Sequence, residues 1–281
     1  MNNNRPSKTP AGRTGRRYRG NMNSQEVLLH IEDAVATITL NRPAVGNCIS
    51  RELADGLVDA LRRVADDASV RAVILCGNGK HFCTGGDIPR LVALTETAAR
   101  YDEINNTGTV IRLMTTMPKP VVAAVHGMAA GAGLGFMLAA DMIVCASDAK
   151  VMSAFAKVGL VSDCGVAYML TRLLGRQKAK ELLMLSDPLD AAELHRLGVV
   201  NMIVPADALR ETAQNLARRL AAAAPLSMRL IKELVNESDA TDLGQALRRE
   251  ESVQTMCLAS DDFSEGATAF LERRAPAFTG K

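Results

Sequence analysis

Two glycine-bearing segments, each directly after an apolar run, constrain this chain more than any other feature. Residues 81–87 (HFCTGGD) follow the apolar run 72–76, and residues 126–133 (HGMAAGAG) follow the run 121–125. Glycine has no Cβ, so the backbone in these segments can approach another group closely. Each segment also precedes a predicted helix, where the first N–H groups have no partner inside the helix. Two such segments converging on one oxygen would form an oxyanion hole.

Strand and helix patterns alternate through the first part of the chain. A hairpin is predicted around Glu32-Asp33, and Ser50 is typical of the N-cap of an amphipathic helix. Buried strands are expected at 70–76, 121–125 and 142–146, with helices at 101–116 and 134–140. This alternation favours an α/β fold with a parallel sheet and crossover helices. The polar stretch 89–101 is expected to be mobile.

Helical periodicity dominates after about residue 164, and only 199–204 is typical of another strand. Pro225 separates an alanine-rich helix from the helices that follow it. We therefore predict a basic tail at 1–22, a core at 23–224 and a helical C-terminal region at 225–281. The expected helices are 165–174, 176–185, 190–196, 206–223, 226–238, 242–258 and 261–273.

The positive charge of the chain is concentrated in its first 22 residues. That tail holds six Lys and Arg and no acid, so removing it changes the formal net charge from +2 to −4. Its composition is typical of disorder. It lacks the apolar stretch of a secretion signal, and no part of the chain approaches the roughly 18 apolar residues of a membrane span. We expect a cytoplasmic protein without a membrane partner. A nucleic-acid-binding arm and a mitochondrial-type transit peptide are the less favoured alternatives for the tail.

Several kinds of site are disfavoured by spacing. The six cysteines form no C-x-x-C pair and the four histidines show no metal-ligand spacing, so we expect reduced thiols and no metal site. The run 131–136 departs from a dinucleotide fingerprint, because Phe136 stands where the last glycine is needed. A phosphate-binding loop and a G-x-S-x-G elbow are both absent from the sequence.

An ordered series of motifs from about residue 25 to residue 281 resembles the enoyl-CoA hydratase/isomerase (crotonase) family. The resemblance implies a spiral of ββα units with a helical C-terminal trimerisation region. It implies an acyl-CoA thioester as substrate, a homotrimer or dimer of trimers, and no cofactor beyond the coenzyme A of the substrate. The motifs are Asn41-Arg42-Pro43 with Asn47, 70–75, 82–88, 119–127, 130–133 with Asp141, 159–163, 173–175 and 265–278.

The family's oxyanion hole maps onto the backbone N–H groups of Gly86 and Ala132. Reactions at the α or β carbon of a thioester place negative charge on its oxygen, and losing one donor to such an oxygen costs about 2.7–4 kcal/mol. The alternative is that both segments are only tight turns. Substrate contacts implied by the resemblance, or expected beside the site, involve Ala44, Val45, Cys83, Gly85, Asp87, Ile88, Gly131, Phe155 and Leu160.

The departures from the family pattern are more informative. The two glutamates with which hydratases of this family activate water map onto Gly135 and Phe155, so that acid/base pair is missing. Asp163 remains, and it either caps the following helix or moves protons. This resembles the ring-epoxide isomerase branch of phenylacetyl-CoA degradation, in which a lone aspartate is implicated in proton transfer. We expect the apolar neighbours Phe155, Leu160 and Val161 to raise its pKa by desolvation.

The sequence therefore favours isomerase-type proton transfer by Asp163 on an acyl-CoA. One alternative is a hydratase that positions water in another way, and a second is a non-catalytic or RNA-binding relative that uses the basic tail. We expect Asp87 to order the first glycine segment, and His81 and His126 to be structural. Arg42, Arg90 and Lys281 are expected to be solvated surface side chains.

Overall fold

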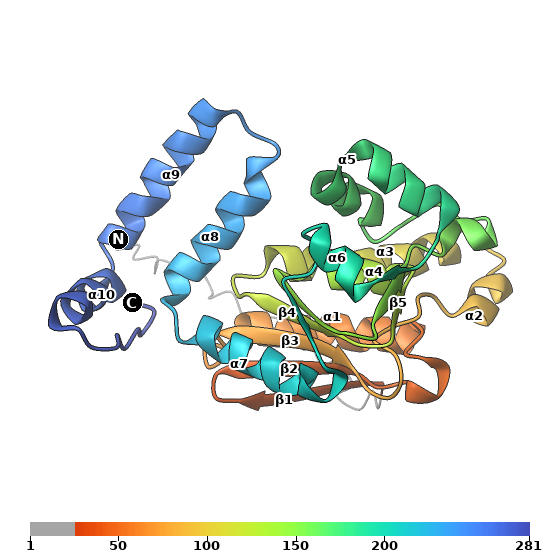
Figure 1. Ribbon diagram of the computed structural model, residues 1–281, viewed down its shortest axis with the longest axis horizontal. Helices are drawn as coiled ribbons and strands as arrows, with labels where there is room; N and C mark the ends of the chain where they lie inside the picture. Colours follow the sequence, from red (N-terminus) through yellow and green to blue (C-terminus); the bar gives the residue numbers. More distant parts are fainter. Residues whose placement is uncertain (1–25) are drawn as a thin grey trace, which may run out of the picture.

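The computed structural model describes residues 26–281, so the predictions for the tail at 1–22 lie outside the described residues. A six-stranded sheet, ordered β1-β2-β3-β4-β6-β9, is the centre of the fold (Figure 1). The hairpin of β1 and β2 is antiparallel, and all other neighbours in this sheet are parallel, as predicted. The strands are β1 (Val27–Glu32), β2 (Val35–Leu40), β3 (Ala72–Gly77), β4 (Val121–Val125), β6 (Met142–Ala146) and β9 (Met202–Val204).

A second sheet of three short strands, ordered β5-β7-β8, was not predicted. It consists of β5 (Met128–Ala130), β7 (Lys150–Met152) and β8 (Leu189–Asp190). Strands of two or three residues are too short to show an alternating pattern, and they exist because tertiary pairing supplies their hydrogen bonds. Because β5 lies inside the second glycine segment, that segment is a strand followed by a turn, and not a turn alone.

The spiral of ββα units is visible in how each turn of chain feeds both sheets. β4 continues into β5 and then α4 (Ala132–Leu138), and β6 continues into β7 and then the 3₁₀ helix η2 (Phe155–Val158). β3 is followed by a single bridge at Cys83, which pairs with Ala129 of β5, and then by α2 (Ile88–Ala93). The glycine segments are therefore the links between the two sheets.

Helices cover both faces of the larger sheet. Alternate residues of each strand point to opposite faces, so Ile74 packs with one buried cluster and Val73 and Leu75 with the other. α7 (Leu209–Ala221) covers the first face with its alanine stripe. The second face packs against α1 (Arg51–Asp66), which Ser50 caps as predicted, its Oγ accepting from the Leu53 amide at 3.0 Å.

The remaining helices differ from the prediction mainly between β3 and β4. The stretch 89–101, which was expected to be mobile, holds α2 and the first turn of α3 (Thr97–Thr116), and no helix was predicted over α2. α5 (Val166–Leu185) is interrupted at Gly175, whose φ of 76° and ψ of 164° are not helical, between the two helices predicted there. α6 is Ala191–Arg196, and the 3₁₀ helices η1 and η3 are Pro43–Val45 and Ala206–Ala208.

The last 57 residues, 225–281, form a C-terminal arm that extends to one side of the layered core (Figure 1). The arm consists of α8 (Pro225–Ser238), α9 (Leu243–Leu258), α10 (Asp261–Glu272) and the tail that follows them. Within residues 26–281, no helix is long and apolar enough to cross a membrane.

A buried lysine joins the arm to the core. Lys232 on α8 donates from Nζ to Asp141 Oδ2 at 2.7 Å, and also to the carbonyls of Met114 at 2.6 Å and Lys119 at 3.2 Å. Desolvation raises the pKa of Asp141 and lowers that of Lys232. Asp141 also accepts from the Val121 amide at 2.7 Å, so this pair fixes the start of β4 relative to α8.

Candidate active site

The two glycine segments lie side by side because they pair as strands. The Cys83 amide donates to Met128 O at 3.1 Å, and the Ala130 amide donates to Cys83 O at 2.9 Å. The carboxyl ends of β3 and β4, which are neighbours in the sheet, deliver these segments to the same edge. The convergence expected from the sequence is thus a consequence of parallel strand order.

Two glycines make the approach possible. Gly85 has a φ of 98°, and a Cβ at that position would lie 3.0 Å from Ala130 O and 3.5 Å from Gly131 Cα. Gly131 has a φ of 54° and a ψ of −126°, and its amide donates to Met152 O at 3.1 Å. A side chain at either position would be strained by the backbone angles and would press against the other segment. The next residues along the chain, Gly86 and Ala132, are therefore neighbours.

The N–H groups of Gly86 and Ala132 donate to no acceptor within residues 26–281. Ala132 is the first residue of α4, where the N–H has no intrahelical acceptor. On either side of Gly86, the Ile49 amide donates to Gly85 O at 2.8 Å and the Asp87 amide donates to Ile49 O at 3.3 Å. In an extended backbone these bonds turn the Gly86 N–H away from Ile49. The described structure thus leaves two adjacent main-chain donors available to a ligand.

A buried asparagine braces the first segment, and the sequence analysis assigned it no role beyond a family motif. Asn47 is fully buried, with a φ of 56°. Its Nδ2 donates to Asn78 O at 2.9 Å, His81 O at 2.7 Å and Phe82 O at 3.1 Å, and its Oδ1 accepts from the Arg42 amide at 2.8 Å. The Asn41-Arg42-Pro43 motif with Asn47 was the available signal.

Asp87 orders the first segment, as expected. Its Oδ1 accepts from the Arg90 amide at 3.3 Å and caps α2, while its Oδ2 lies 3.3 Å from Nη1 of Arg42. Arg42 also donates to Cys48 O at 2.7 Å and pairs with Glu26 at 3.1 Å. The expectation of a solvated Arg42 is wrong, because this half-buried side chain ties the loop at 42–48 to α2.

The histidines are structural, as expected. His81 Nδ1 accepts from the Met128 amide at 3.2 Å, and His126 Nε2 lies 2.9 Å from Gly79 O. Arg90 is engaged with a buried glutamate that the sequence analysis missed: its Nε donates to Glu103 Oε1 at 2.9 Å and its Nη2 to Oε2 at 3.2 Å. This ion pair fastens α2 to α3.

The two positions expected to match the hydratase glutamates, 135 and 155, carry no carboxylate in this chain. A Cβ on Gly135 would lie 2.5 Å from Cys164 Cβ and 2.9 Å from Cys164 O, so no side chain fits there without movement. Phe155 is buried, and its ring Cζ lies 4.0 Å from where a Cβ on Gly131 would stand. Cys164 therefore occupies the space that a longer residue at 135 would need.

Asp163 precedes this cysteine and does not cap the helix. The N-cap of α5 is Gly165, and the Val166 amide bonds to the carbonyl of Asp163 at 3.0 Å, so its carboxylate has no capping role. Oδ1 is buried and has no hydrogen-bond partner within the described chain. Desolvation raises the pKa of Asp163, partly opposed by the Cys164 thiol. A half-buried carboxyl group with one buried, unpartnered oxygen and a raised pKa is suited to general acid/base chemistry.

Desolvation raises the pKa as predicted, but two of the three apolar neighbours named for it are exposed. Leu160 is 50% exposed and Val161 is 85% exposed, so neither is a buried wall for the carboxylate, whereas Phe155 is buried. Of the remaining predicted substrate contacts, Ala44 and Val45 lie exposed on η1. Ile88, at the start of α2, is 43% exposed. These three residues are thus on the surface beside the braced first segment.

Residues 26–281 contain no group of three or more His, Cys, Asp or Glu side chains that could hold a metal ion. The described cysteines are all free thiols, and burial raises the pKa of Cys83 to about 12.

A spiral of ββα units whose links bring together two free main-chain donors defines the crotonase class of proteins. The family model described as enoyl-CoA hydratase/isomerase matches residues 30–281. The chain belongs to this family.

The chain is similar both to a relative named as an isomerase and to one named as a hydratase, in each case over almost the whole length of the relative. The chain is 37% identical to 1,2-epoxyphenylacetyl-CoA isomerase of Escherichia coli (strain K12), with 91% of this chain and 98% of the relative covered. It is 34% identical to crotonyl-CoA hydratase of Syntrophomonas wolfei, with 92% and 99% covered. A crystal structure of an enoyl-CoA hydratase from Polaromonas sp. JS666 superposes with a TM-score of 0.88 at 34% identity, covering 90% of this chain and 99% of that one.

Proposed function

We propose that this enzyme isomerises an acyl-CoA, with Asp163 moving the proton and the amides of Gly86 and Ala132 holding the thioester oxygen. The observation that carries the proposal is the carboxyl group of Asp163, whose Oδ1 is buried without a partner in the described chain. Gly135 and Phe155, at the positions of the hydratase glutamates, offer no second carboxylate. A single carboxylate can take a proton from one carbon and return it to another, which suits isomerisation.

The proposed chemistry balances without any further reagent. The Asp163 carboxylate takes a proton from the carbon next to the thioester of an unsaturated acyl-CoA, and the electron pair moves onto the thioester oxygen. The two amides stabilise that enolate. The protonated aspartic acid then returns the proton at the far end of the conjugated system, so the double bond has moved and the carboxylate is regenerated.

The substrate contacts are part of the same proposal. Coenzyme A would extend from the amide pair past Gly85, Asp87 and Ile88 to Ala44 and Val45, where the surface is exposed. The acyl group would lie beside Cys83, Gly131, Phe155 and Leu160. This division agrees with burial, because a CoA headgroup is charged and solvated while the first three of the residues beside the acyl group are buried. No cofactor beyond the coenzyme A of the substrate takes part.

The assembly and location stay proposals as well. A homotrimer, or a dimer of trimers, is proposed because the C-terminal arm exposes large apolar side chains such as Val235, Leu243, Phe270 and Leu271, each at least 65% exposed. Exposed apolar side chains gathered on one arm in this number are typical of a protein–protein contact. A cytoplasmic location, and the division into a core at 23–224 and a helical region at 225–281, are proposed on the sequence arguments given above.

Water addition is the alternative reaction, and the 34% identity to a crotonyl-CoA hydratase favours keeping it. The deciding experiment incubates the full chain with enoyl-CoAs of different double-bond positions in heavy water, followed by mass spectrometry. A moved double bond without addition of water supports the isomerase, and solvent deuterium enters the product to the extent that the Asp163 proton exchanges before it is returned. Addition of water identifies the hydratase, and the absence of any acyl-CoA turnover or binding contradicts both.

A further inference from the structure

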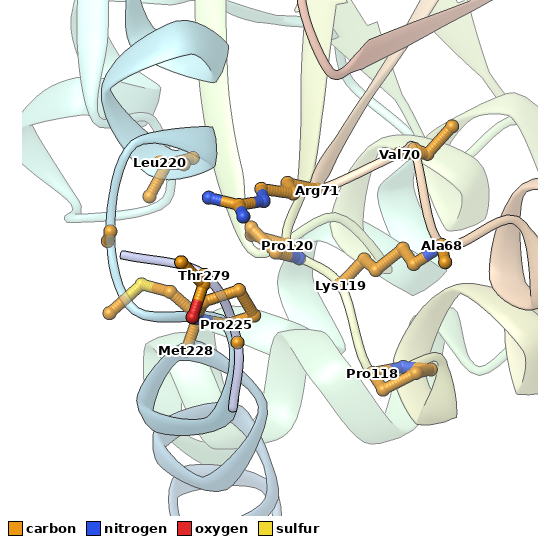
Figure 2. Close-up of a pocket in the computed structure, with 12 residues that line it drawn as sticks. Ala68, Val70, Arg71, Pro118, Lys119, Pro120, Leu220, Pro225, Met228 and Thr279 are labelled. Atoms are coloured by element: carbon orange, nitrogen blue, oxygen red, sulfur yellow. The ribbon is translucent and has the colours of Figure 1, made fainter. Parts of the chain in front are cut away.

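A cavity at the junction of the core and the C-terminal arm has a built arrangement of charges that the proposed reaction does not use. Its volume is about 260 Å³. Four stretches of chain line it: the turn at 68–71 before β3, the turn at 118–120 before β4, the α7–α8 link at 220–228, and the tail at 279–280 (Figure 2). It thus lies at the amino ends of β3 and β4, whereas the glycine segments follow their carboxyl ends.

Two cations line this cavity, and no acidic side chain does. They are Arg71 and Lys119, and neither forms an ion pair within the described chain. Asp262, which bonds to the tail at this cavity, is engaged elsewhere: both of its carboxylate oxygens accept from tail amides, at 2.7 and 2.9 Å. Asp67 and Asp66 act on Lys119 only at a distance, and burial lowers the pKa of Lys119.

One edge of the Arg71 guanidinium group has no hydrogen-bond acceptor within the described chain. Nη1 donates to Phe278 O at 2.9 Å, while Nε and Nη2 donate to no acceptor in residues 26–281. Figure 2 shows the side chain extending between Pro120 and Leu220 toward Thr279. The Nε–Nη2 edge has the fork geometry that matches the two oxygens of a carboxylate.

The lysine contributes charge, and its hydrogen bonds are partly used. Lys119 Nζ donates to Asp67 O at 2.6 Å and to Val64 O, at the end of α1. Its ammonium group therefore has a fixed position beside the turn at 68–71. Neither cation has a contact ion pair in the described chain, and Asp66 and Asp67 act on Lys119 alone, so an anion in the cavity would stabilise both cations.

The walls and the volume limit what the anion can be. Apart from the two cations and Thr279, the lining is apolar, with Pro118, Pro120 and Leu220 among it. Drug-sized ligands occupy pockets of roughly 300–1,000 Å³, so a cavity of about 260 Å³ suits a ligand smaller than these. We propose that the junction cavity binds a small carboxylate anion with a short aliphatic chain, through the Nε–Nη2 edge of Arg71 and the charge of Lys119.

Such a ligand would contact the core turns, the α7–α8 link and the tail together. Binding would therefore stabilise the docking of the arm on the core, because a ligand that binds only the folded state adds its binding free energy to stability. The site lies at the opposite edge of the sheet from Gly86 and Ala132, so occupancy does not require the acyl site.

The test uses butyrate as the probe. Equilibrium dialysis with labelled butyrate measures its binding to the full chain, and thermal unfolding measures its effect on Tm. Saturable binding with a rise in Tm is expected for butyrate, with a smaller effect for inorganic phosphate and none for the uncharged butyramide. Arg71→Met should abolish binding, Arg71→Lys should weaken it at least tenfold, and Arg51→Met, on the exposed face of α1, should leave it unchanged.

Two results would overturn the proposal: no saturable binding of butyrate to the wild-type chain, or binding of equal strength to Arg71→Met. If Arg71→Met does not fold, the Arg71→Lys measurement decides in its place. Butyrate that is displaced by crotonyl-CoA would lie in the acyl site and would also overturn the proposal. These outcomes are independent of whether the enzyme is an isomerase.

Discussion

Replacing Asp163 with asparagine separates the chemical role of this side chain from any structural one. The substitution keeps the shape and removes the ionisable group. The carboxylate caps no helix, and its Oδ1 has no hydrogen-bond partner in the described chain, so no bond to that oxygen is lost. The local turn is held by the main-chain carbonyl of Asp163, bonded to the Val166 amide at 3.0 Å, and this bond survives.

The expected loss of activity follows from the size of general acid/base catalysis. A positioned acid or base contributes typically about 10²–10⁴-fold to rate, so kcat for double-bond migration should fall by that factor while KM changes little. The amides of Gly86 and Ala132 are untouched, so binding of the acyl-CoA should persist. The assay is steady-state turnover of the best enoyl-CoA in the heavy-water panel, with binding measured by calorimetry.

Stability should change in the opposite direction, and the sign is fixed by the pKa. Desolvation raises the pKa of Asp163 in the folded state, so ionisation of this group costs stability at neutral pH. Below the pKa of the unfolded chain both states are protonated and the cost disappears. The asparagine variant should therefore be at least as stable as wild type near neutral pH, with the advantage fading in acid.

The same raised pKa predicts the acid limb of the wild-type rate. If Asp163 takes the proton as a carboxylate, kcat/KM should fall as the pH drops through its folded-state pKa, which lies above the ordinary value of 3.8. Turnover of Asp163→Asn within threefold of wild type would refute the mechanism. Loss of activity together with a large loss of stability would instead identify a structural role.

Three further predictions concern the surroundings of the site. Gly135→Glu should not create a hydratase, because its Cβ would stand 2.5 Å from Cys164 Cβ. We expect the variant to lose about 1–3 kcal/mol of folding stability and to add no water to crotonyl-CoA, as measured by mass spectrometry. Hydration activity at an unchanged Tm would contradict this prediction. Lys232→Met should lose about 1–3 kcal/mol in urea unfolding, because Asp141 and the Met114 carbonyl lose the donor that they share. Adding Asp141→Asn should restore part of this loss, and an unchanged midpoint in the single variant would refute the anchor. Cys83 has a pKa raised to about 12, so iodoacetamide near neutral pH should alkylate it only after the chain unfolds. Labelling is mapped by peptide mass spectrometry, and rapid labelling of Cys83 in the native chain would contradict its burial.

Long-range pairing explains most of what the sequence did not predict. β5, β7 and β8 have two or three residues each, and their hydrogen bonds come from strands far away in the chain. The ion pair of Arg90 with Glu103 and the anchor of Lys232 on Asp141 join residues separated by 13 and 91 positions. Local sequence patterns do not indicate which distant residue will be the partner. The helix α2 was not predicted for the same reason, since it is held by Asp87 and by the pairing of Arg90 with Glu103.

The sequence by itself determined the units of this protein. Apolar runs set the large strands, Ser50 and Pro225 marked helix starts, and the glycines at 85 and 131 marked where the backbone must come close, because these signals act within a few residues. The motif series gave the family, and the residues at 135, 155 and 163 indicated which carboxylates are present.

Only the tertiary structure decided what those units do together. Parallel order placed the segments after β3 and β4 at one edge and paired Cys83 with Ala129, which leaves the amides of Gly86 and Ala132 adjacent. Packing put Cys164 over Gly135 and left Oδ1 of Asp163 buried without a partner. Proximity and desolvation arise from the whole fold, and these two quantities give a backbone amide or a carboxylate its chemistry.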